Sequence, residues 1–237
     1  MPVSQLKQIN KPLISIILPC RNEEQSLAQS INSIRKVLDN SNLTGEIIVS
    51  DSSNDHSPDI ARQFADKLVK HDKEGYGLAY LEGFEVAVGE ILFLADPDGS
   101  YDFGEIPRFV NEVINKDYDF IIGNRFQGKI HPGAMPFLHQ KLGSPILTHI
   151  FRYLYQLPIG DINCGMRAIK HSLLPKLELS ATGMEFASEM LIKASRHNLK
   201  IKELPIDYYP RLGDSKLRTF PDGWRHFKLM INHKFAK

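Results

Sequence analysis

Residues 91–98 of the chain spell ILFLADPD, an apolar run that ends in two aspartates separated by one proline. A short continuous apolar run is typical of a strand buried on both faces of a parallel sheet. Asp96 and Asp98 therefore come at the carboxyl end of the predicted strand, which we place at 91–95. Open α/β sheets bind their ligands beyond the carboxyl ends of the strands. The stretch thus predicts both the fold class and the edge of the sheet at which chemistry takes place.

The same kind of run recurs on both sides of this stretch and alternates with helical periodicity. Predicted strands lie at 13–18, 46–50, 68–69 and 119–122, and predicted helices at 27–38, 57–65, 77–88 and 105–115. In the first helix Leu27, Ile31 and Ile34 follow the spacing that places apolar side chains on one helical face. Alternating strands and helices of these lengths predict an α/β fold with a mostly parallel, Rossmann-like sheet and helices on both faces.

The regular alternation ends near residue 125. Residues 127–145 are rich in Gly and Pro, and they predict a loop or an inserted segment. Further helices are predicted at 146–155, 184–196 and 224–231, and a further strand at 200–208. The chain shows no internal repeat, low-complexity tract or clear linker, so we expect a single domain over residues 1–237.

The composition of the 237-residue chain, with 42% hydrophobic and 24% charged residues, is typical of a globular protein. It excludes a disordered chain, a collagen-like chain and a coiled coil, and two cysteines exclude a disulfide scaffold. The first residues lack the apolar core of a signal peptide, and no apolar run approaches the ~20 residues of a membrane span. We therefore expect a cytoplasmic protein, with any membrane contact being peripheral and at the inner face.

The net charge of +1 hides a gradient along the chain. The net charge is −9 over residues 1–120, +3 over 121–192 and +7 over 193–237. An acidic N-terminal part and a basic C-terminal part suit a phosphate-rich ligand that is held by a metal ion on one side and by cations on the other. The alternative is an unevenly charged solvated surface, which would give the same net charges. We expect no nucleic acid partner, and the sequence does not indicate an oligomeric state.

The two aspartates that follow the 91–95 strand are candidate metal ligands. Two carboxylates one residue apart can share a hard divalent cation, which keeps waters and bridges to phosphate oxygens. The alternative for Asp96 and Asp98 is an ordinary polar loop. Calcium binding of the EF-hand type is excluded, because the positions that require Gly and Glu hold Tyr101 and Pro107.

Carboxylates also follow other predicted strands. Asp51 follows the strand at 46–50 and can accept hydrogen bonds from the N–H groups of a nucleotide base. Asp55 is placed to cap the helix that follows it. Glu23 has two interpretations: contact with a nucleotide, or a favourable charge at the positive end of the first helix.

Cations for phosphate groups form a third set of candidates. They are Arg125, Arg167, Arg211, Lys216 and Arg218. Arginine suits two-point contacts with phosphate, whereas a solvated surface charge is the alternative for any single one of them. The glycines around Tyr76 lack the third glycine of a dinucleotide fingerprint, so NAD binding is excluded.

Taken in order, these motifs resemble the family 2 glycosyltransferases, and within them the dolichol-phosphate or polyprenol-phosphate sugar synthases. The resemblance covers about residues 12–230 and rests on the following segments: LPCRNEEQSL, VSDSSND, GYGLAYLEGFEVAVGEILFLADPDGSYDF, IIGNRF, DINCGMRAIK, GMEFASEM and RLGDSKLRTFPDGWRH. It implies a GT-A fold, a nucleotide-sugar donor (a UDP- or GDP-hexose), Mg²⁺ or Mn²⁺, and inversion of the anomeric centre by in-line attack. It also implies that residues 1–125 bind the donor and that residues 126–237 bind the acceptor.

The resemblance assigns roles residue by residue. Pro19, Arg21 and Glu23 would line the nucleoside pocket, and Asp51 would meet the base. Asp96 and Asp98 would hold the metal and the diphosphate. Arg125, Arg211 and Lys216 would neutralise the donor and acceptor phosphates. The sequence departs from the family in two places, since the family usually has an aromatic residue where Arg21 stands and often a second aspartate where Ser50 stands.

The acceptor leaves alternatives open. A polyprenyl phosphate is already ionised at neutral pH and needs no base, whereas a sugar hydroxyl requires a general base, for which Glu185 and Glu189 are candidates. Because the two glutamates are four residues apart, they are predicted to lie on the same face of a helix. The alternative to a catalytic role is an exposed acidic pair on that helix. A third reading is a nucleotide-sugar-binding protein that lacks catalysis. The apolar stripe at 146–155 and the basic C-terminal segment are candidates for contact with anionic lipid, with core packing as the alternative for the stripe.

Overall fold

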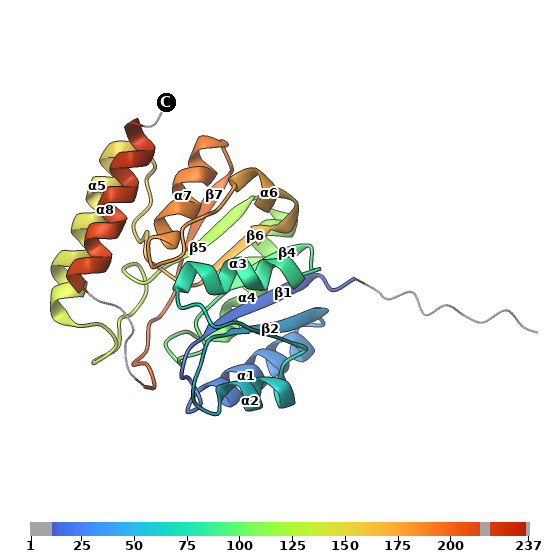
Figure 1. Cartoon of the computed structure of the whole chain (residues 1–237). Helices are drawn as coiled ribbons and strands as arrows, with labels where there is room; N and C mark the ends of the chain where they lie inside the picture. The colour runs from blue at the N-terminus through green and yellow to red at the C-terminus, as the bar shows by residue number, and fades with distance from the viewer. Residues whose placement is uncertain (1–10, 214–218, 236–237) are drawn as a thin grey trace, which may run out of the picture.

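The structure, a computed structural model, describes residues 11–213 and 219–235 (Figure 1). A seven-stranded sheet in the order β3-β2-β1-β4-β6-β5-β7 forms its centre. The strands are β1 (Ile14–Cys20), β2 (Gly45–Asp51), β3 (Lys67–Lys70), β4 (Ile91–Leu94), β5 (Phe120–Asn124), β6 (Arg167–Lys170) and β7 (Ile201–Pro205). Neighbouring strands are parallel except at β6, which runs antiparallel to β4 and β5. The expected α/β fold with a mostly parallel sheet is confirmed.

One face of the sheet packs against α1 (Leu27–Asn40), α2 (Ser57–Phe64) and α4 (Ile106–Asn115). In register, Ile16 of β1 lies between Ile47 of β2 and Phe93 of β4, and all three are buried. Phe93 meets Phe109 of α4 edge to face, with ring centroids 5.6 Å apart. Such an aromatic pair contributes about 0.5–1.5 kcal/mol beyond the area that it buries. This apolar layer fixes β4, and with it the position of the aspartates at its end.

The opposite face carries α3 (Tyr76–Val86) and α7 (Phe186–Arg196). Gly83 allows α3 to approach the sheet closely, because a Cβ there would lie 2.6 Å from Cγ2 of Ile17. Tyr80 of α3 stacks on Phe186 at the start of α7, with centroids 5.5 Å apart. These contacts hold the start of α7 beside α3, on the side of the sheet where the Glu185 candidate lies.

Two further long helices lie side by side beyond α7 (Figure 1). They are α5 (Ser144–Tyr155) and α8 (Thr219–Phe235), and the one-turn helix α6 (Leu174–Leu177) precedes α7. The Tyr155 hydroxyl donates to the Met230 carbonyl at 2.7 Å, and Ser188 of α7 shares a 2.7 Å hydrogen bond with His226 of α8. Within the described part of the chain, no helix has the length and apolar content needed to cross a membrane.

Two parts of the structure differ from the sequence-based prediction. The predicted loop at 127–145 is wrong at its end, because a turn of π-helix at His139–Gly143 leads directly into α5. Pro145 does not interrupt this helix, since proline is tolerated in the first turn. The sequence also fails to predict β6, because its four residues include two charged ones and show no apolar run.

Candidate active site

Asp98 and Arg211 meet at the carboxyl edge of the sheet. Nη2 of Arg211 lies 3.0 Å from Oδ2 of Asp98, and the Leu212 N–H donates to the Asp98 carbonyl at 2.7 Å. The Ser100 N–H donates to the other carboxylate oxygen of Asp98 at 2.9 Å. The segment after β7 is therefore bound to the loop after β4, which brings a predicted phosphate-binding cation to a predicted metal ligand.

Glu23 lies in the same group. Its Oε1 is 3.6 Å from Nη2 of Arg211, and its side chain is 7% exposed. A cleft of about 370 Å³ opens beside it, lined by Asn22, Glu23, Glu24, Gln25, Asn54, Asp55, Leu212 and Gly213. The structure thus brings Glu23, Asp98 and Arg211 together from three distant parts of the sequence.

Asp96 has the features expected of a cation ligand. Its Oδ1 is buried and has no hydrogen-bond partner among residues 11–213 and 219–235. Burial, with the Asp98 carboxylate beside it, raises the pKa of Asp96 to about 7. Its Oδ2 lies 2.7 Å from where a Cβ on Gly165 would be, so the glycine leaves room for this carboxylate.

The donor set fits a divalent metal that shares its coordination with substrate. Among residues 11–213 and 219–235 no group of three or more His, Cys, Asp or Glu side chains forms a metal cage. Asp96 and Asp98 therefore offer a partial set of hard oxygen ligands, which suits a cation that takes its other ligands from phosphates and water. A cation there would also satisfy the unpartnered oxygen of Asp96 and offset the repulsion between the two carboxylates.

Arg125 is held in place by Asp161, a residue that the sequence analysis did not single out. Nε and Nη2 of Arg125 donate to the two carboxylate oxygens at 2.7 and 2.8 Å, and both side chains are buried. The guanidinium also lies 5.0 Å from the ring centroid of Tyr208. Its charge opposes the rise in the pKa of Asp96, so Arg125 lies within electrostatic reach of this candidate metal ligand. Asp161 is the first residue of the DINCGMRAIK segment, and that segment is the sequence signal that could have identified it.

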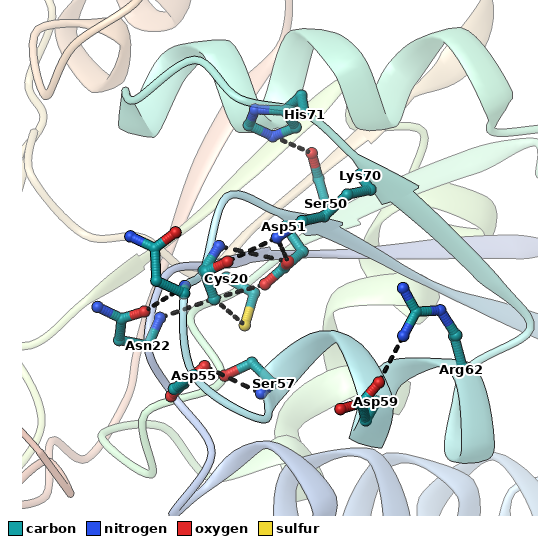
Figure 2. Close-up of polar contacts among 12 residues, drawn as sticks. Cys20, Asn22, Ser50, Asp51, Asp55, Ser57, Asp59, Arg62, Lys70 and His71 are labelled. Atoms are coloured by element: carbon teal, nitrogen blue, oxygen red, sulfur yellow. Dashed lines mark hydrogen bonds and ion pairs between the residues drawn. The ribbon is translucent and has the colours of Figure 1, made fainter.

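The predicted nucleoside end lies where β1, β2 and β3 finish (Figure 2). Asp51 is fully buried, and its carboxylate accepts from Lys70 Nζ at 2.7 Å and from Ser53 Oγ at 2.5 Å. Arg21 forms an ion pair with Glu74, which lies two residues before the first residue of α3. Lys70 and Ser53 fix the direction of the Asp51 carboxylate, and neither was identified from the sequence.

The remaining acidic candidate near this end has a local role. The Asp55 carboxylate accepts the Ser57 N–H at 2.9 Å, at the start of α2, and the Glu24 N–H at 3.2 Å. Asp55 therefore ties the beginning of α2 to the loop after β1, which supports the interpretation that it stabilises a helix start.

The two glutamates proposed as a base separate in the structure. Glu189, within α7, is buried, and it accepts hydrogen bonds from Lys193 and from the N–H groups of Ser180 and Ala181. Burial acts to raise the pKa of Glu189, but these hydrogen bonds hold that pKa below its usual range. Glu185 precedes the first residue of α7, and its buried Oε2 has no hydrogen-bond partner in the described part of the chain. Of the two, Glu185 is therefore the candidate whose carboxylate is not fully engaged in hydrogen bonds within the described residues.

Four other candidates from the sequence remain. Pro19 lies half-buried in β1 beside Cys20, at the nucleoside end. Arg167 is buried and donates to three main-chain carbonyls, so its role is to hold the chain together. Lys216 and Arg218 lie outside the described residues.

Comparisons with known proteins identify the family of the chain. The family model for glycosyl transferase family 2 matches residues 15–177. The chain is 41% identical over 220 residues to the low-salt glycan biosynthesis hexosyltransferase Agl6 of Haloferax volcanii, covering 93% of this chain and 53% of that protein. It therefore spans about half the length of that relative. It is 29% identical to the dolichyl-phosphate hexose transferase of the same organism, covering 89% of each protein.

Solved structures show the same fold. Glucosyl-3-phosphoglycerate synthase from Mycobacterium tuberculosis, in complex with Mn²⁺, UDP and phosphoglyceric acid, superimposes with a TM-score of 0.74 at 18% identity, covering 95% of this chain and 80% of that one. Mannosyl-3-phosphoglycerate synthase from Rubrobacter xylanophilus gives a TM-score of 0.69 at 14% identity, covering 94% and 72%. These are GT-A fold glycosyltransferases, so the expected fold is confirmed. The family match and the curated relatives together show that the chain is a glycosyltransferase and belongs to glycosyltransferase family 2.

Proposed function

We propose that this enzyme transfers a hexose from a nucleotide-sugar to a polyprenyl or dolichyl phosphate, with a divalent metal, at a membrane surface. The observation that carries the proposal is the contact between Asp98 and Arg211, which joins a carboxylate pair to a cation at one edge of the sheet. A nucleoside diphosphate is a leaving group that needs both, since a metal and fixed cations offset its developing negative charge. The relative named a dolichyl-phosphate hexose transferase supports this class of acceptor.

The donor would lie along the carboxyl ends of β1, β2 and β4. Asp51, oriented by Lys70 and Ser53, would accept hydrogen bonds from the base, with Pro19 and Arg21 beside the nucleoside. Asp96 and Asp98 would hold Mg²⁺ or Mn²⁺, which supplies positive charge to the diphosphate. Arg211, in contact with Asp98, would add a second positive charge beside the diphosphate.

The acceptor phosphate would enter near Arg125. Its oxygen attacks the anomeric carbon, a new C–O bond forms, and the bond from that carbon to the diphosphate oxygen breaks with both electrons leaving on the diphosphate. No proton moves, because a phosphomonoester is already ionised at pH 7. Arg125, held by Asp161 in one orientation, is suited to position the attacking phosphate.

A membrane contact is supported by the surface around α5 and α8. Seven of the ten exposed large apolar side chains among the described residues lie there: Phe137, Leu138, Leu142, Ile146, Tyr153, Trp224 and Phe235. Residues 126–160 contain no Asp or Glu, and the single acidic residue of α8, Asp222, is buried. Apolar side chains set among uncompensated cations are typical of a surface that lies on anionic lipid. Core packing, the alternative for the 146–155 stripe, holds for most of it. Phe151 is buried, and four further residues pack against the core: Leu147, Ile150, Leu154 and Tyr155. Ile146 of the stripe and the neighbouring Tyr153 are exposed.

A second candidate function is transfer to a hydroxyl of a soluble or glycan acceptor. The observation that favours it is the buried, unpartnered Oε2 of Glu185, because a hydroxyl nucleophile needs a base. Two solved structures of the same fold contain a small polar phosphate compound beside the nucleotide: phosphoglyceric acid with UDP, and glycerol 3-phosphate with UDP-glucose.

The test is a transfer assay with radiolabelled UDP- and GDP-hexoses, Mn²⁺ or Mg²⁺, and either a polyprenyl phosphate in vesicles or an aqueous glycan extract. The proposal predicts metal-dependent label in an organic-extractable lipid that mild acid releases. Label that enters only the aqueous glycan contradicts the lipid acceptor and supports the second candidate.

A further inference from the structure

Two tyrosine hydroxyls gather with the Asp96 carboxylate around Gly165. A Cβ on Gly165 would lie 2.7 Å from Oδ2 of Asp96, 3.0 Å from the Tyr76 hydroxyl oxygen and 3.1 Å from the Tyr101 hydroxyl oxygen. Glycine has only a hydrogen atom at that position. Three oxygens, one from the start of α3 and two from the loop after β4, therefore converge on a space that any other side chain would fill.

The start of α3 fixes the position of Tyr76. A Cβ on Gly75 would lie 2.3 Å from the carbonyl oxygen of Thr182. A Cβ on Gly77 would lie 2.2 Å from the carbonyl oxygen of Ala181, and the Gly77 N–H donates to a carbonyl of the same segment at 3.2 Å. Glycine on both sides of Tyr76 thus lets α3 begin in direct contact with the segment that leads into α7.

Tyr76 binds one of the two oxygens of Asp96. Its hydroxyl is a hydrogen-bond partner of the Asp96 carboxylate, and this bond opposes the rise in the pKa of Asp96 that burial causes. Oδ1 has no partner among the residues that the structure describes, so the oxygen that receives the bond is Oδ2, beside Gly165. One oxygen of Asp96 is therefore held, and the other is left for a ligand.

Tyr101 fixes the main chain of Gly165. Its hydroxyl accepts the Gly165 N–H at 2.8 Å, its side chain is buried, and its ring centroid lies 5.4 Å from that of Tyr208. Arg167 also donates to the carbonyl of Cys164, the residue before Gly165, at 2.8 Å. With its main chain fixed on both sides, Gly165 limits the directions in which the neighbouring carboxylate can turn.

We propose that Tyr76 and Tyr101 are positioning residues for the metal centre: with Gly165, they fix Oδ2 of Asp96 and leave Oδ1 to bind a divalent cation. The inference rests on the proposed function, which assigns the cation to Asp96 and Asp98. Both tyrosines act through Asp96. Hydrogen bonds that orient a metal ligand in this way contribute about 10–100-fold to metal affinity or activity.

Measurements of Mn²⁺ binding test the proposal apart from transfer. Mn²⁺ would be titrated into the full chain, alone and with equimolar UDP or GDP, and electron paramagnetic resonance would give the concentration of free ion. We expect Tyr76→Phe to weaken Mn²⁺ binding about tenfold or more, because it removes the hydroxyl and keeps the ring. The affinity for nucleotide without metal should stay the same.

The transfer assay gives a second readout for Tyr76→Phe. The Mn²⁺ concentration that gives half of the maximal rate should rise by about the same factor of ten or more. The rate at saturating Mn²⁺ should return to nearly that of the unchanged enzyme. A general loss of structure would lower the rate at every Mn²⁺ concentration.

A second variant and a control separate position from packing. Gly165→Ala keeps both hydroxyls and adds the Cβ that would lie 2.7 Å from Oδ2 of Asp96, so it should also weaken Mn²⁺ binding. Tyr118→Phe is the matched control, because this partly buried tyrosine precedes β5 at the opposite edge of the sheet. It should bind Mn²⁺ as the unchanged protein does.

The outcomes distinguish this inference from the proposed function. Unchanged Mn²⁺ binding in Tyr76→Phe, or an equal loss in Tyr118→Phe, would overturn the inference. If Asp98→Asn loses Mn²⁺ binding and Tyr76→Phe does not, the inference fails and the metal of the proposed function stands. If Tyr76→Phe loses Mn²⁺ binding while label never enters lipid, the inference stands and the proposed acceptor fails. A chain that binds no Mn²⁺ with either nucleotide would contradict both.

Discussion

The guanidinium of Arg125 is bound at two points by the carboxylate of Asp161, at 2.7 and 2.8 Å, and both side chains are buried at the edge of the sheet. The pair joins the end of β5 to the loop that leads into β6. Asp161 itself is held from behind, since the Gly160 and Asp161 N–H groups both donate to Glu203 of β7. Three segments are therefore cross-linked by charged groups beside the site.

Loss of this pair should destabilise the protein. In Asp161→Asn the charge of Arg125 is left buried without its partner, and breaking a buried pair in this way costs about 3–5 kcal/mol. Urea unfolding would measure the free energy of unfolding. Asp117→Asn is the control, because its ion pairs with Lys170 and Lys200 are on the surface. A difference of less than about 1 kcal/mol between the two variants would contradict a supporting role for Asp161.

Asp98→Asn should remove activity and leave the fold intact. The side chain is one of two proposed metal ligands and the partner of Arg211, so we expect transfer to fall by about 100-fold or more. Initial rates at saturating donor would show the loss, and circular dichroism would show a native spectrum. Asp39→Asn, at the exposed end of α1, should retain full activity. Near-normal transfer by Asp98→Asn would refute the metal assignment.

Glu185→Gln separates the two candidate acceptors. If the acceptor is a lipid phosphate, no base is needed, and the rate should stay within about twofold of that of the unchanged enzyme. If a hydroxyl is glycosylated, the same substitution should slow the reaction about 100-fold or more. The measurement is kcat with each acceptor in turn, and Glu82→Gln on the outer part of α3 serves as the control.

Stability should fall on mild acidification because of His226. Burial lowers the pKa of this residue to about 4 from 6.5, against the opposing charge of nearby Asp222 and with a smaller contribution from Arg167. A lowered pKa means that the unfolded chain binds the proton more tightly. The stability that neutral His226 provides is therefore complete above pH 6.5 and is lost as the pH falls toward 4. The full effect is about 3 kcal/mol.

The variant that tests this is His226→Gln, which keeps a hydrogen-bonding group for Ser188. The free energy of unfolding, measured between pH 4 and pH 7, should vary less steeply in this variant than in the unchanged protein. His197→Gln, at the exposed end of α7, should leave the pH dependence of the free energy of unfolding unchanged. An unchanged slope in His226→Gln would show that other groups control the acid response.

Leu142→Glu/Ile146→Glu should weaken attachment to anionic vesicles. Each change replaces an exposed apolar side chain on the α5 side with a negative charge, and burying such a side chain in lipid contributes about 1.5–3 kcal/mol. Sedimentation with vesicles of phosphatidylglycerol and phosphatidylcholine would give the bound fraction. Ile114→Glu, an exposed apolar position on α4, is the matched control and should bind as the unchanged protein does. An equal loss of vesicle binding in Ile114→Glu and in Leu142→Glu/Ile146→Glu would contradict a specific lipid-binding face around α5.

The sequence predicts the parallel part of the fold well, because β1, β2, β4 and β5 are buried, largely apolar runs. It also predicts that Glu23, Asp98 and Arg211 belong to one site, and the structure brings these three together. It does not predict β6, since that strand is stabilised by pairing on both sides and not by its own pattern. Nor does spacing distinguish Glu185 from Glu189, because the difference between them depends on the distant N–H groups of Ser180 and Ala181.

The antiparallel β6 has a consequence for the way the chain can be divided. Because β6 lies between β4 and β5, the last three strands in the spatial order are out of sequence order, and each half of the chain supplies neighbours to the other. A fragment that ended after β5 would leave β4 with an unpaired, fully apolar edge and β5 without either neighbour. Donor-binding and acceptor-binding residues are therefore expected to unfold in one cooperative transition, and separately expressed halves are expected to aggregate unless they are produced together.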